Sequence, residues 1–299
     1  VTLEECFELA EEEEDCKDGW ELASRLAQKM LPQIFRADSP VFEVKLSMNR
    51  IDELESLISK LDTQTYQAQD SLGWCYQFWQ TKKKEEVNKS GVRIGAQELS
   101  PVTQLFTEPY MVSFLLDNAL GAWWANKLLS KDDLIRANSE QELRDLASIH
   151  GVPLEYLRFT QDEFGNNIGW KPAAGGFEKW PEHLGELKVL DPCCGSGGML
   201  IQSRNYLIEN GENPRNISLF GQEMNQGTWA ICKINMFLHS VFNADIKKGD
   251  TIRDPKHLKS GELMTFDRVI ANPPFSLAKW GKEEADNDSF GRFPYGTPP

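Results

Sequence analysis

Residues 187–210 read LKVLDPCCGSGGMLIQSRNYLIEN, and this stretch decides the fold class. An apolar run ends at Asp191, a glycine-rich turn follows up to Gly198, and a segment of helical character comes next. A short apolar strand that passes through a tight turn into a helix is the first half of a strand–helix–strand unit with parallel strands. The stretch therefore predicts an α/β fold from Leu187 onward.

The same rhythm continues towards the C-terminal end of the sequence. Apolar strands are predicted at ISLFGQE (217–223), ADIKKGD (244–250) and FDRVIANPPF (266–275), with a helix at GTWAICKINMFLHS (227–240). Alternating strands and helices with short connections form a parallel sheet covered by helices. Ligands of such sheets bind beyond the carboxyl ends of the strands, so the residues that follow each strand are the candidate site.

The sequence divides into three predicted regions, of which the last contains this α/β fold. Residues 1–100 form a mostly helical N-terminal domain, with helices expected at 19–35 and 51–61. Residues 101–186 form a helical segment and a loop that lead into the α/β domain, and residues 187–299 form this α/β domain. The stretches 85–101 and 160–186 are predicted to be loops, and 132–159 to be helical. Thr107 is the predicted N-cap of a helix with Pro109 in its first turn.

The segment LGWCYQFWQTKKKEE (72–86) has two interpretations. Its aromatic residues could lie in a core helix with a solvated end, or they could form a nucleic-acid surface with the following lysines. Two glutamates cancel much of that charge. The net charge of −14 also argues against broad phosphate binding by this chain.

Composition excludes several other classes of protein. We find no apolar run near the length of a membrane span, and the acidic start is not a signal peptide. The six cysteines and four histidines show no zinc-like spacing, so no metal site is predicted. Reduced thiols in a cytoplasmic protein are the expectation.

Acidic residues end three successive predicted strands. Asp191 leads the glycine loop, where it would repel a phosphate but suits a ligand that carries an ammonium group beside its carboxylate. Glu223 can accept both hydroxyls of a ribose, and Asp250 can accept from the exocyclic amine of an adenine. Together the three predict a pocket for an adenosine with an amino-acid tail and no phosphates, which describes S-adenosylmethionine.

The fourth strand stops at Asn272-Pro273-Pro274-Phe275. The lone pair of an aromatic amine such as adenine N6 is delocalised, so the amine is a poor nucleophile. Acceptors from Asn272 and the Pro273 carbonyl can draw on its hydrogens, while the prolines fix the geometry and Phe275 stacks on the base. The target adenine would have to be flipped out of the duplex.

The motifs LDPCCGSGGML, GQEMNQGTWAICKINMFLH, KKGDTIRD and FDRVIANPPFSLAKWG resemble those of DNA adenine-N6 methyltransferases, and above all the modification subunits of type I restriction systems. LGWCYQFWQTKKKEEV and QLFTEPYMVSFLLDNALG are more similar to the methyltransferases of BREX-type phage-defence systems. The likeness covers about residues 70–130 and 187–299. One departure is Glu108, which separates Thr107 from Pro109 where relatives have Thr-Pro.

The resemblance implies a Rossmann-like methyltransferase sheet and a set of site residues. The implied catalytic residues are Asn272, Pro273, Pro274 and Phe275, and the implied cofactor-binding residues are Thr107, Asp191, Pro192, Cys193, Gly195, Ser196, Gly197, Glu223, Met224, Asp250, Thr251 and Asn272. The family's sheet has further strands after the catalytic motif, so we expect the chain to be an N-terminal fragment that lacks them.

The activity implied is transfer of a methyl group from S-adenosylmethionine to a flipped-out adenine of double-stranded DNA in a restriction or phage-defence system. The implied partners are DNA, reached through regions beyond this chain, and specificity or defence-complex subunits, with no membrane. Two alternatives stay open at this point. The site could serve RNA adenine or a protein glutamine, or the chain could be a cofactor-binding scaffold without turnover.

Overall fold

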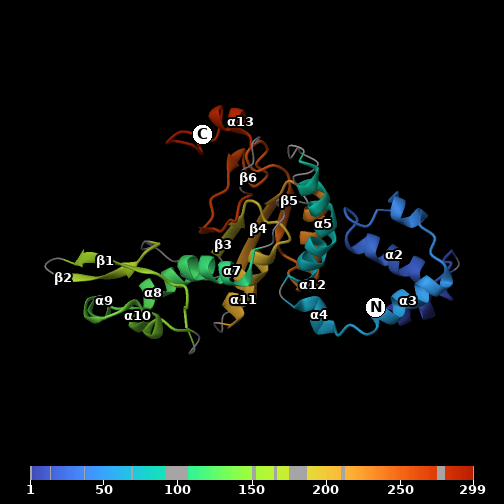
Figure 1. Cartoon of the computed structure of the whole chain (residues 1–299), viewed down its shortest axis with the longest axis horizontal. Coiled ribbons are helices and arrows are strands. Elements are labelled where there is room, and N and C mark those ends of the chain that lie inside the picture. Colours follow the sequence, from blue (N-terminus) through green and yellow to red (C-terminus); the bar gives the residue numbers. More distant parts are fainter. Residues whose placement is uncertain are drawn as a thin grey trace. The chain divides into compact units, whose positions relative to one another are not determined.

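A computed structural model describes residues 2–298, except 14, 37, 69, 92–106, 150–152, 165–166, 175–186, 210–212 and 275–279. The chain divides into two compact units, Val1–Thr63 and Gln64–Pro299 (Figure 1). The domain boundaries predicted at residues 100 and 186 lie outside the described residues and stay predictions. Among the described residues, none of the helices combines the length and the apolar character that crossing a bilayer requires.

The first unit is helical, as predicted. It contains α1 (Leu3–Ala10), α2 (Gly19–Met30), the 3₁₀ turn η1 (Pro40–Glu43) and α3 (Met48–Ile58). Asp18 caps α2 by accepting from the Glu21 amide at 2.8 Å. The helix ends at Met30, two residues before Pro32, because proline cannot continue the hydrogen-bond ladder. Cys6, Ala10 and Leu22 form the small core of this unit.

The second unit is built on a four-stranded parallel sheet with the order β5-β4-β3-β8. The strands are β3 (Leu187–Asp191), β4 (Ile217–Glu223), β5 (Asp245–Lys248) and β8 (Arg268–Val269), which confirms the predicted α/β arrangement. Asp191 lies opposite Gly221, and Glu223 lies opposite Lys248. Because all four strands run in the same direction, their carboxyl ends meet at one edge.

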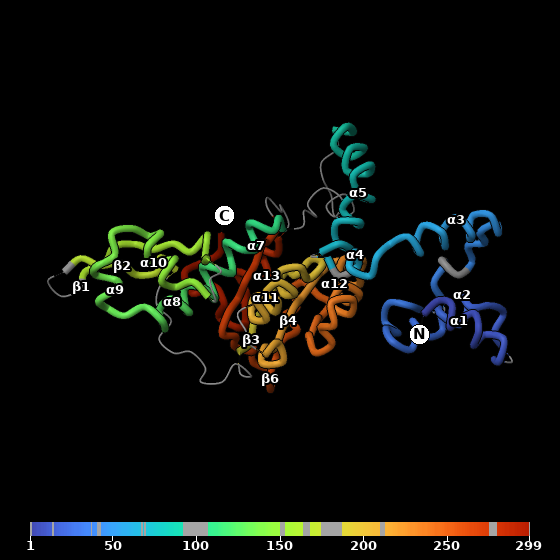
Figure 2. The backbone as a smooth tube through the Cα atoms, turned by 90° about the horizontal axis from the view of Figure 1, so that it is seen from below, coloured from blue at the N-terminus to red at the C-terminus, as the bar shows by residue number. Residues whose placement is uncertain are grey.

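Two helices cross over between neighbouring strands of this sheet. α11 (Gly198–Glu209) packs on β3 and β4, and α12 (Gln226–Leu238) packs on β4 and β5 (Figures 1 and 2). Asn225 caps α12 by accepting from the Thr228 amide at 3.0 Å. The 3₁₀ turn η4 (Pro214–Asn216) leads into β4. These connections set the loop after each strand against the start of a helix.

The helix α5 (Ser71–Ser90) follows α4 (Thr63–Gln67) and packs beside α12 (Figures 1 and 2). The prediction of a loop at 85–101 is wrong for 85–90, because lysine and glutamate favour helix and Lys89 pairs with Glu85. The rest of that stretch, apart from Gly91 at the helix end, lies outside the described residues. Phe78 and Trp79 are each 79% exposed, so the core interpretation is wrong for them.

The apolar helix predicted after Thr107 is present as α7 (Pro109–Leu116), a π-helical turn η2 (Asp117–Gly121) and α8 (Ala122–Leu128). Its N-cap is Glu108 and not Thr107. The residue before a proline is held in extended conformation, and Pro109 takes the first helical position. The cap therefore falls on the residue next to the proline.

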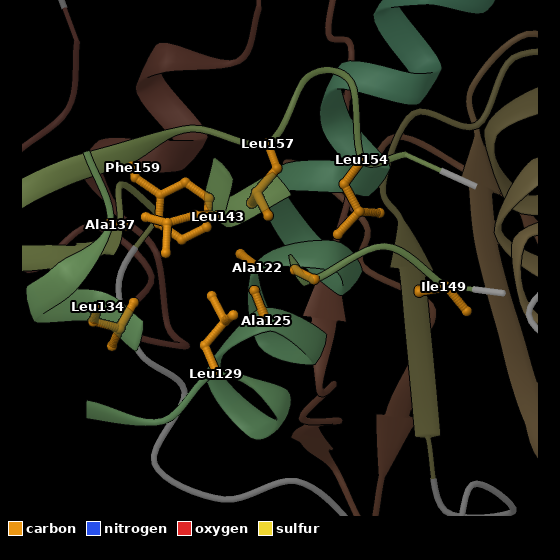
Figure 3. Close-up of a cluster of buried hydrophobic side chains, with 11 residues drawn as sticks. Ala122, Ala125, Leu129, Leu134, Ala137, Leu143, Ile149, Leu154, Leu157 and Phe159 are labelled. Carbon is orange, nitrogen blue, oxygen red and sulfur yellow. The ribbon is translucent and has the colours of Figure 1, made fainter. Parts of the chain in front are cut away.

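A second hydrophobic core lies beside this helix, where α9 (Lys131–Arg136), α10 (Glu140–Leu146) and the antiparallel hairpin β1 (Phe159–Phe164) and β2 (Asn167–Pro172) meet α8. Figure 3 shows side chains of this core, which come from these elements and from the segments that connect them. Its members are Ala122, Ala125, Leu129, Leu134, Ala137, Leu143, Ala147, Ile149, Leu154, Leu157 and Phe159.

Two predictions for this region need correction. The loop predicted at 160–186 is wrong for the described residues of 160–172, which form the two strands, because a strand that contains Asn167, Gly169 and Pro172 has the composition of a loop. The helix predicted over 132–159 holds for α9 and α10 but not for residues 153–158. There the backbone bonds to side chains of η2 instead: Asn118 accepts from the Arg158 amide at 3.0 Å and donates to the Tyr156 carbonyl at 2.7 Å.

The last described part of the chain packs against the loop after β5. It includes the short antiparallel pair β6 (Leu258–Lys259) and β7 (Glu262–Leu263), and α13 (Lys282–Asp286). Arg292 donates to the carbonyl groups of Thr251 and Ile252, each at 2.7 Å, and pairs with Asp288. The C-terminal residues thus brace a loop at the carboxyl edge of the sheet.

Candidate functional site

The loops that follow the four strands are joined to one another at the carboxyl edge. Asp191 ends β3 and Glu223 ends β4, while Asp250 and Asn272 follow β5 and β8 after short connections. The Gly195 amide donates to Glu223 Oε2 at 3.1 Å, which ties the glycine loop to the end of β4. The structure therefore brings the predicted loop and the predicted ribose acid together.

The loop after β5 is tied in as well. The Thr251 hydroxyl donates to the Pro192 carbonyl, which lies at the start of the glycine loop. The loop's own turns are fixed by the Cys194 amide, which donates to the Gln222 carbonyl at 3.1 Å, and by the Gly197 amide, which donates to the Cys194 carbonyl at 2.7 Å. Each of these bonds holds backbone beside a strand end.

Gly197 shows why the loop needs glycine. Its φ is +85°, a conformation that L side chains rarely adopt. A Cβ at this position would lie 2.5 Å from Met236 Cε and 2.8 Å from Cys232 Sγ. The loop can therefore pass close to α12 only because this residue has no side chain. Gly195, with φ of +54°, also adopts the left-handed region.

Asp191 is completely buried at the end of β3. Its Oδ1 accepts from the Cys193 amide at 3.1 Å, while Oδ2 has no hydrogen-bond partner among the described residues. Burial, with a smaller contribution from the Glu223 charge, raises the pKa of Asp191 to about 7. A buried carboxylate oxygen without a donor is costly, and a cationic ligand would relieve that cost.

Glu223 is held by backbone donors on both carboxylate oxygens. Oε1 accepts from the Asn225 amide at 2.8 Å and Oε2 accepts from Gly195. Burial raises the pKa of Glu223 above its ordinary value, although these backbone bonds act in the opposite direction. Since each carboxylate oxygen has two lone pairs, Glu223 keeps capacity to accept from ligand hydroxyls.

A cavity of about 340 Å³ lies between the glycine loop, α7 and Asn272. Asn272 Nδ2 donates to Thr107 Oγ1 at 3.2 Å, so the segment that follows β8 meets the segment that precedes α7 at the cavity wall. Of the predicted site residues, the lining includes Thr107, Cys193, Gly195, Ser196 and Asn272. The structure therefore gathers predicted cofactor and catalytic residues around one space.

Other predicted residues lie outside this lining, and they include Asp191, Pro192, Gly197, Glu223 and Thr251. Met224 is half exposed, and Pro273 and Pro274 are exposed. The Asp250 carboxylate accepts from two amides of its own turn and pairs with Arg253 Nη1 at 2.6 Å. Its prediction as an adenine acceptor stays a prediction. Phe275 lies outside the described residues.

The cysteines of the loop are poorly suited to nucleophilic chemistry. Burial, aided by the neighbouring carboxylates, raises the pKa of Cys193 far above its usual range. The Cys194 and Cys232 sulfur atoms lie 3.8 Å apart, and their mutual hydrogen bond and burial also raise the pKa of Cys194. Because the thiolate is the reactive form, these residues act as packing groups.

The cavity has wall residues that the sequence did not point to. Asp70 and Trp74 come from α5 and its cap, and Asp117 and Tyr206 come from η2 and α11. Burial raises the pKa of Asp117 to about 6, although its Oδ2 accepts from the Tyr156 amide at 2.9 Å. Trp74 and Asp117 lie in the two upstream segments that carry the family resemblance, but the contacts that place them at the cavity involve residues distant in sequence and could not be predicted.

A comparison with known families matches the part of the chain that contains the four-stranded sheet. Residues 182–299 match the family model described as N-6 DNA Methylase. We call these residues the methylase domain, after the family model that they match. The glycine loop, Glu223 and Asn272 all lie inside the methylase domain, whereas α5 and α7 precede it.

Curated relatives point the same way. The chain is 32% identical over 113 residues to the type I restriction enzyme HindI methylase subunit of Haemophilus influenzae, covering 38% of this chain and 24% of that protein. It is 27% identical over 180 residues to the adenine-specific methyltransferase BrxX of Escherichia coli, covering 59% of this chain and 13% of that protein. The chain thus spans less than a quarter of the length of these relatives.

Among solved structures, the methyltransferase subunit of a type I restriction-modification system from Streptococcus thermophilus is 29% identical, with a TM-score of 0.26. The match covers 30% of this chain and 18% of that chain.

Proposed function

We propose that the chain is part of an S-adenosylmethionine-dependent DNA adenine-N6 methyltransferase with a Rossmann-like catalytic sheet. The observation that carries this proposal is the shared cavity, whose wall contains both the glycine loop of the methylase domain and Asn272. A methyl donor and a target amine must meet in one space, and these are the residue types that each of them requires.

The residues present fit the cofactor. Asp191 offers a buried oxygen without a donor, which suits the ammonium group of an amino-acid tail. Gly195 and Gly197 take positive φ values, so the loop backbone can approach a ligand closely. Glu223 can accept from ribose hydroxyls while its position is fixed by two amides. When bound, S-adenosylmethionine supplies a methyl group activated by the positive charge of its sulfonium.

Asn272 is the residue that we assign to the target amine. Its Nδ2 group donates to Thr107, which orients the amide so that Oδ1 is the group available to accept. The next backbone carbonyl belongs to Pro273, whose ring restricts the backbone. Two preorganised acceptors would draw on the hydrogens of N6 and favour the nucleophilic form of the nitrogen.

The biological setting and the partners belong to the same proposal. Relatives carry the names of type I restriction methylase subunits and of BrxX, so we propose a role in a restriction or phage-defence system, with double-stranded DNA as substrate and specificity or defence-complex subunits as partners. A cytoplasmic location is proposed with it.

Calorimetric titration of the chain with S-adenosylmethionine is the first test, because the residues that we assign to the cofactor all lie in this chain. Tritium transfer from labelled cofactor to DNA, RNA or protein by the longest available form then identifies the substrate. We expect label in N6-methyladenine of DNA. Label in RNA or in protein glutamine would replace the proposed substrate, and an absence of cofactor binding would refute the proposal.

Asn272→Ala separates chemistry from binding. We expect this variant to lose methyl transfer while its affinity for the cofactor stays within about threefold of the unmodified chain, since one weak neutral hydrogen bond to Thr107 is lost. Methylation at the ordinary rate by this variant would remove Asn272 from the mechanism.

A further inference from the structure

Asp70 connects the upstream helix to the glycine loop. It is the N-cap of α5, where its Oδ1 accepts from the Gly73 amide at 3.1 Å. The same oxygen accepts from Asn235 Nδ2 of α12 at 2.7 Å, and Oδ2 accepts from the Ser196 hydroxyl. One carboxylate therefore joins α5, α12 and the loop after β3.

Ser196 is held at two points by this network. Its hydroxyl donates to Asp70, and its carbonyl accepts from Asn235 Nδ2 at 3.1 Å. Ser196 is 2% exposed and Asn235 is fully buried. The Asn235 Nδ2 group and the Ser196 hydroxyl are both satisfied by this arrangement, and a shift of the loop would leave these buried donors without a partner.

The approach of Asp70 to the loop depends on a glycine. A Cβ at Gly198 would lie 3.1 Å from Asp70 Oδ2, which is tighter than an ordinary contact. The side chain of Asp70 also lines the cavity together with Ser196 and Gly195. The residue is thus placed against the loop on the side that faces the candidate ligand.

Capping alone does not explain an aspartate at this position. Serine caps a helix about as well as aspartate and carries no charge to bury. Burial raises the pKa of Asp70 above its ordinary value, so the carboxylate is disfavoured by its surroundings and is compensated by the donors that it accepts. Two of these donors, Ser196 and Asn235, lie outside the helix that Asp70 caps.

We propose that Asp70 is a positioning residue of the cofactor site, which holds the glycine loop in its binding conformation through Ser196. The inference rests on the proposed function, in which this loop holds the amino-acid tail of S-adenosylmethionine. It makes α5, which lies outside the matched methylase domain, a structural part of the binding site.

Asp70→Ser tests the proposal because it keeps a capping hydroxyl and removes the reach to Ser196 and Asn235. We expect its affinity for S-adenosylhomocysteine to fall at least tenfold, while its affinity for 5′-methylthioadenosine, which has no amino-acid tail, changes less than threefold. Amide hydrogen exchange of residues 193–198 should become faster without any ligand. A merely structural loss would weaken both ligands alike, and that result would overturn the positioning role.

Asp18→Ser is the matched control, since Asp18 also caps a helix but lies in the first unit. It should leave both affinities and the loop exchange unchanged. Ser196→Ala completes a double-mutant cycle with Asp70→Ser, and the two effects should be non-additive, because both remove the same bond.

The outcomes separate the two proposals. If the unmodified chain binds S-adenosylhomocysteine and Asp70→Ser binds it equally well, Asp70 has no positioning role and the proposed function stands. If the unmodified chain binds neither ligand, the proposed function fails and the role of Asp70 fails with it.

Discussion

Cofactor affinity should depend on pH through Asp191. In the free chain the pKa of Asp191 is about 7, because the carboxyl is buried and Oδ2 has no donor. A bound ammonium group favours the ionised form and lowers this pKa in the complex. Below pH 7 the carboxyl must therefore lose a proton before or as the ligand binds, and affinity should rise with pH.

The magnitude follows from the pKa. If the pKa in the complex lies well below 5.5, the apparent dissociation constant is inversely proportional to the fraction of free chain in which Asp191 is deprotonated. This constant should then fall about fifteenfold between pH 5.5 and pH 7, which corresponds to about 1.6 kcal/mol of binding free energy.

The raised pKa of Asp191 also affects the stability of the free chain, but in the opposite direction: stability decreases as pH rises. The folded chain retains a proton between about pH 4 and pH 7, so this group lowers the free energy of unfolding as pH rises through that window, by roughly 4 kcal/mol in total.

Isothermal titration calorimetry with S-adenosylhomocysteine at pH 5.5, 6, 6.5 and 7 measures the slope, and repeats in buffers of different ionisation enthalpy count the proton released. 5′-Methylthioadenosine is the control ligand, because it has no ammonium group. The pH dependence of its affinity therefore reflects Glu223 without the contact to Asp191. In Asp191→Asn, the affinity for S-adenosylhomocysteine should depend on pH only as much as the affinity of the unmodified chain for the control ligand does. The same steep slope in Asp191→Asn would refute the assignment of the tail to this residue.

Three further predictions concern stability. Gly197→Ala should lower the free energy of unfolding in urea by about 1–3 kcal/mol and weaken cofactor binding, because φ is +85° and the new methyl group would lie 2.5 Å from Met236 Cε. An unchanged urea midpoint would contradict this close approach. Arg292→Ala removes donors to the Thr251 carbonyl and should speed amide exchange of residues 250–254, whereas unchanged exchange would mean that the C-terminal brace is dispensable. Leu157→Ala should lower the free energy of unfolding by about 2–5 kcal/mol, since this side chain is fully buried. The folded variant should keep its affinity for the cofactor.

Much of the sheet was predictable because its signals are local. The strand ending at Asp191 and the glycine turn after it lie within one short stretch, and period and composition identify both. Parallel strands place their carboxyl ends at one edge, so the meeting of Glu223 with the loop followed from topology. The contact between Asn272 and Thr107 was not predicted, although the family resemblance implied that both are site residues.

The parts that the sequence did not predict depend on contacts between distant residues. Asp70 meets Ser196 across 126 positions, and nothing near Asp70 distinguishes this cap from that of α2. The chain around Tyr156 has helical composition, but tertiary bonds to Asp117 and Asn118 replace the helical ones. Phe78 has the character of a core residue and is nevertheless exposed, because only one side of α5 packs on α12.

The position of α5 has a practical consequence for anyone who expresses a shortened version of this protein. A boundary drawn at residue 182, where the family match begins, would discard Asp70, Trp74 and Thr107 and leave the pocket open on that side. Such a truncated protein could retain every motif of the methylase and still fail to retain its small-molecule ligand. Starting before residue 64 instead preserves the compact second unit and the complete wall of its cavity.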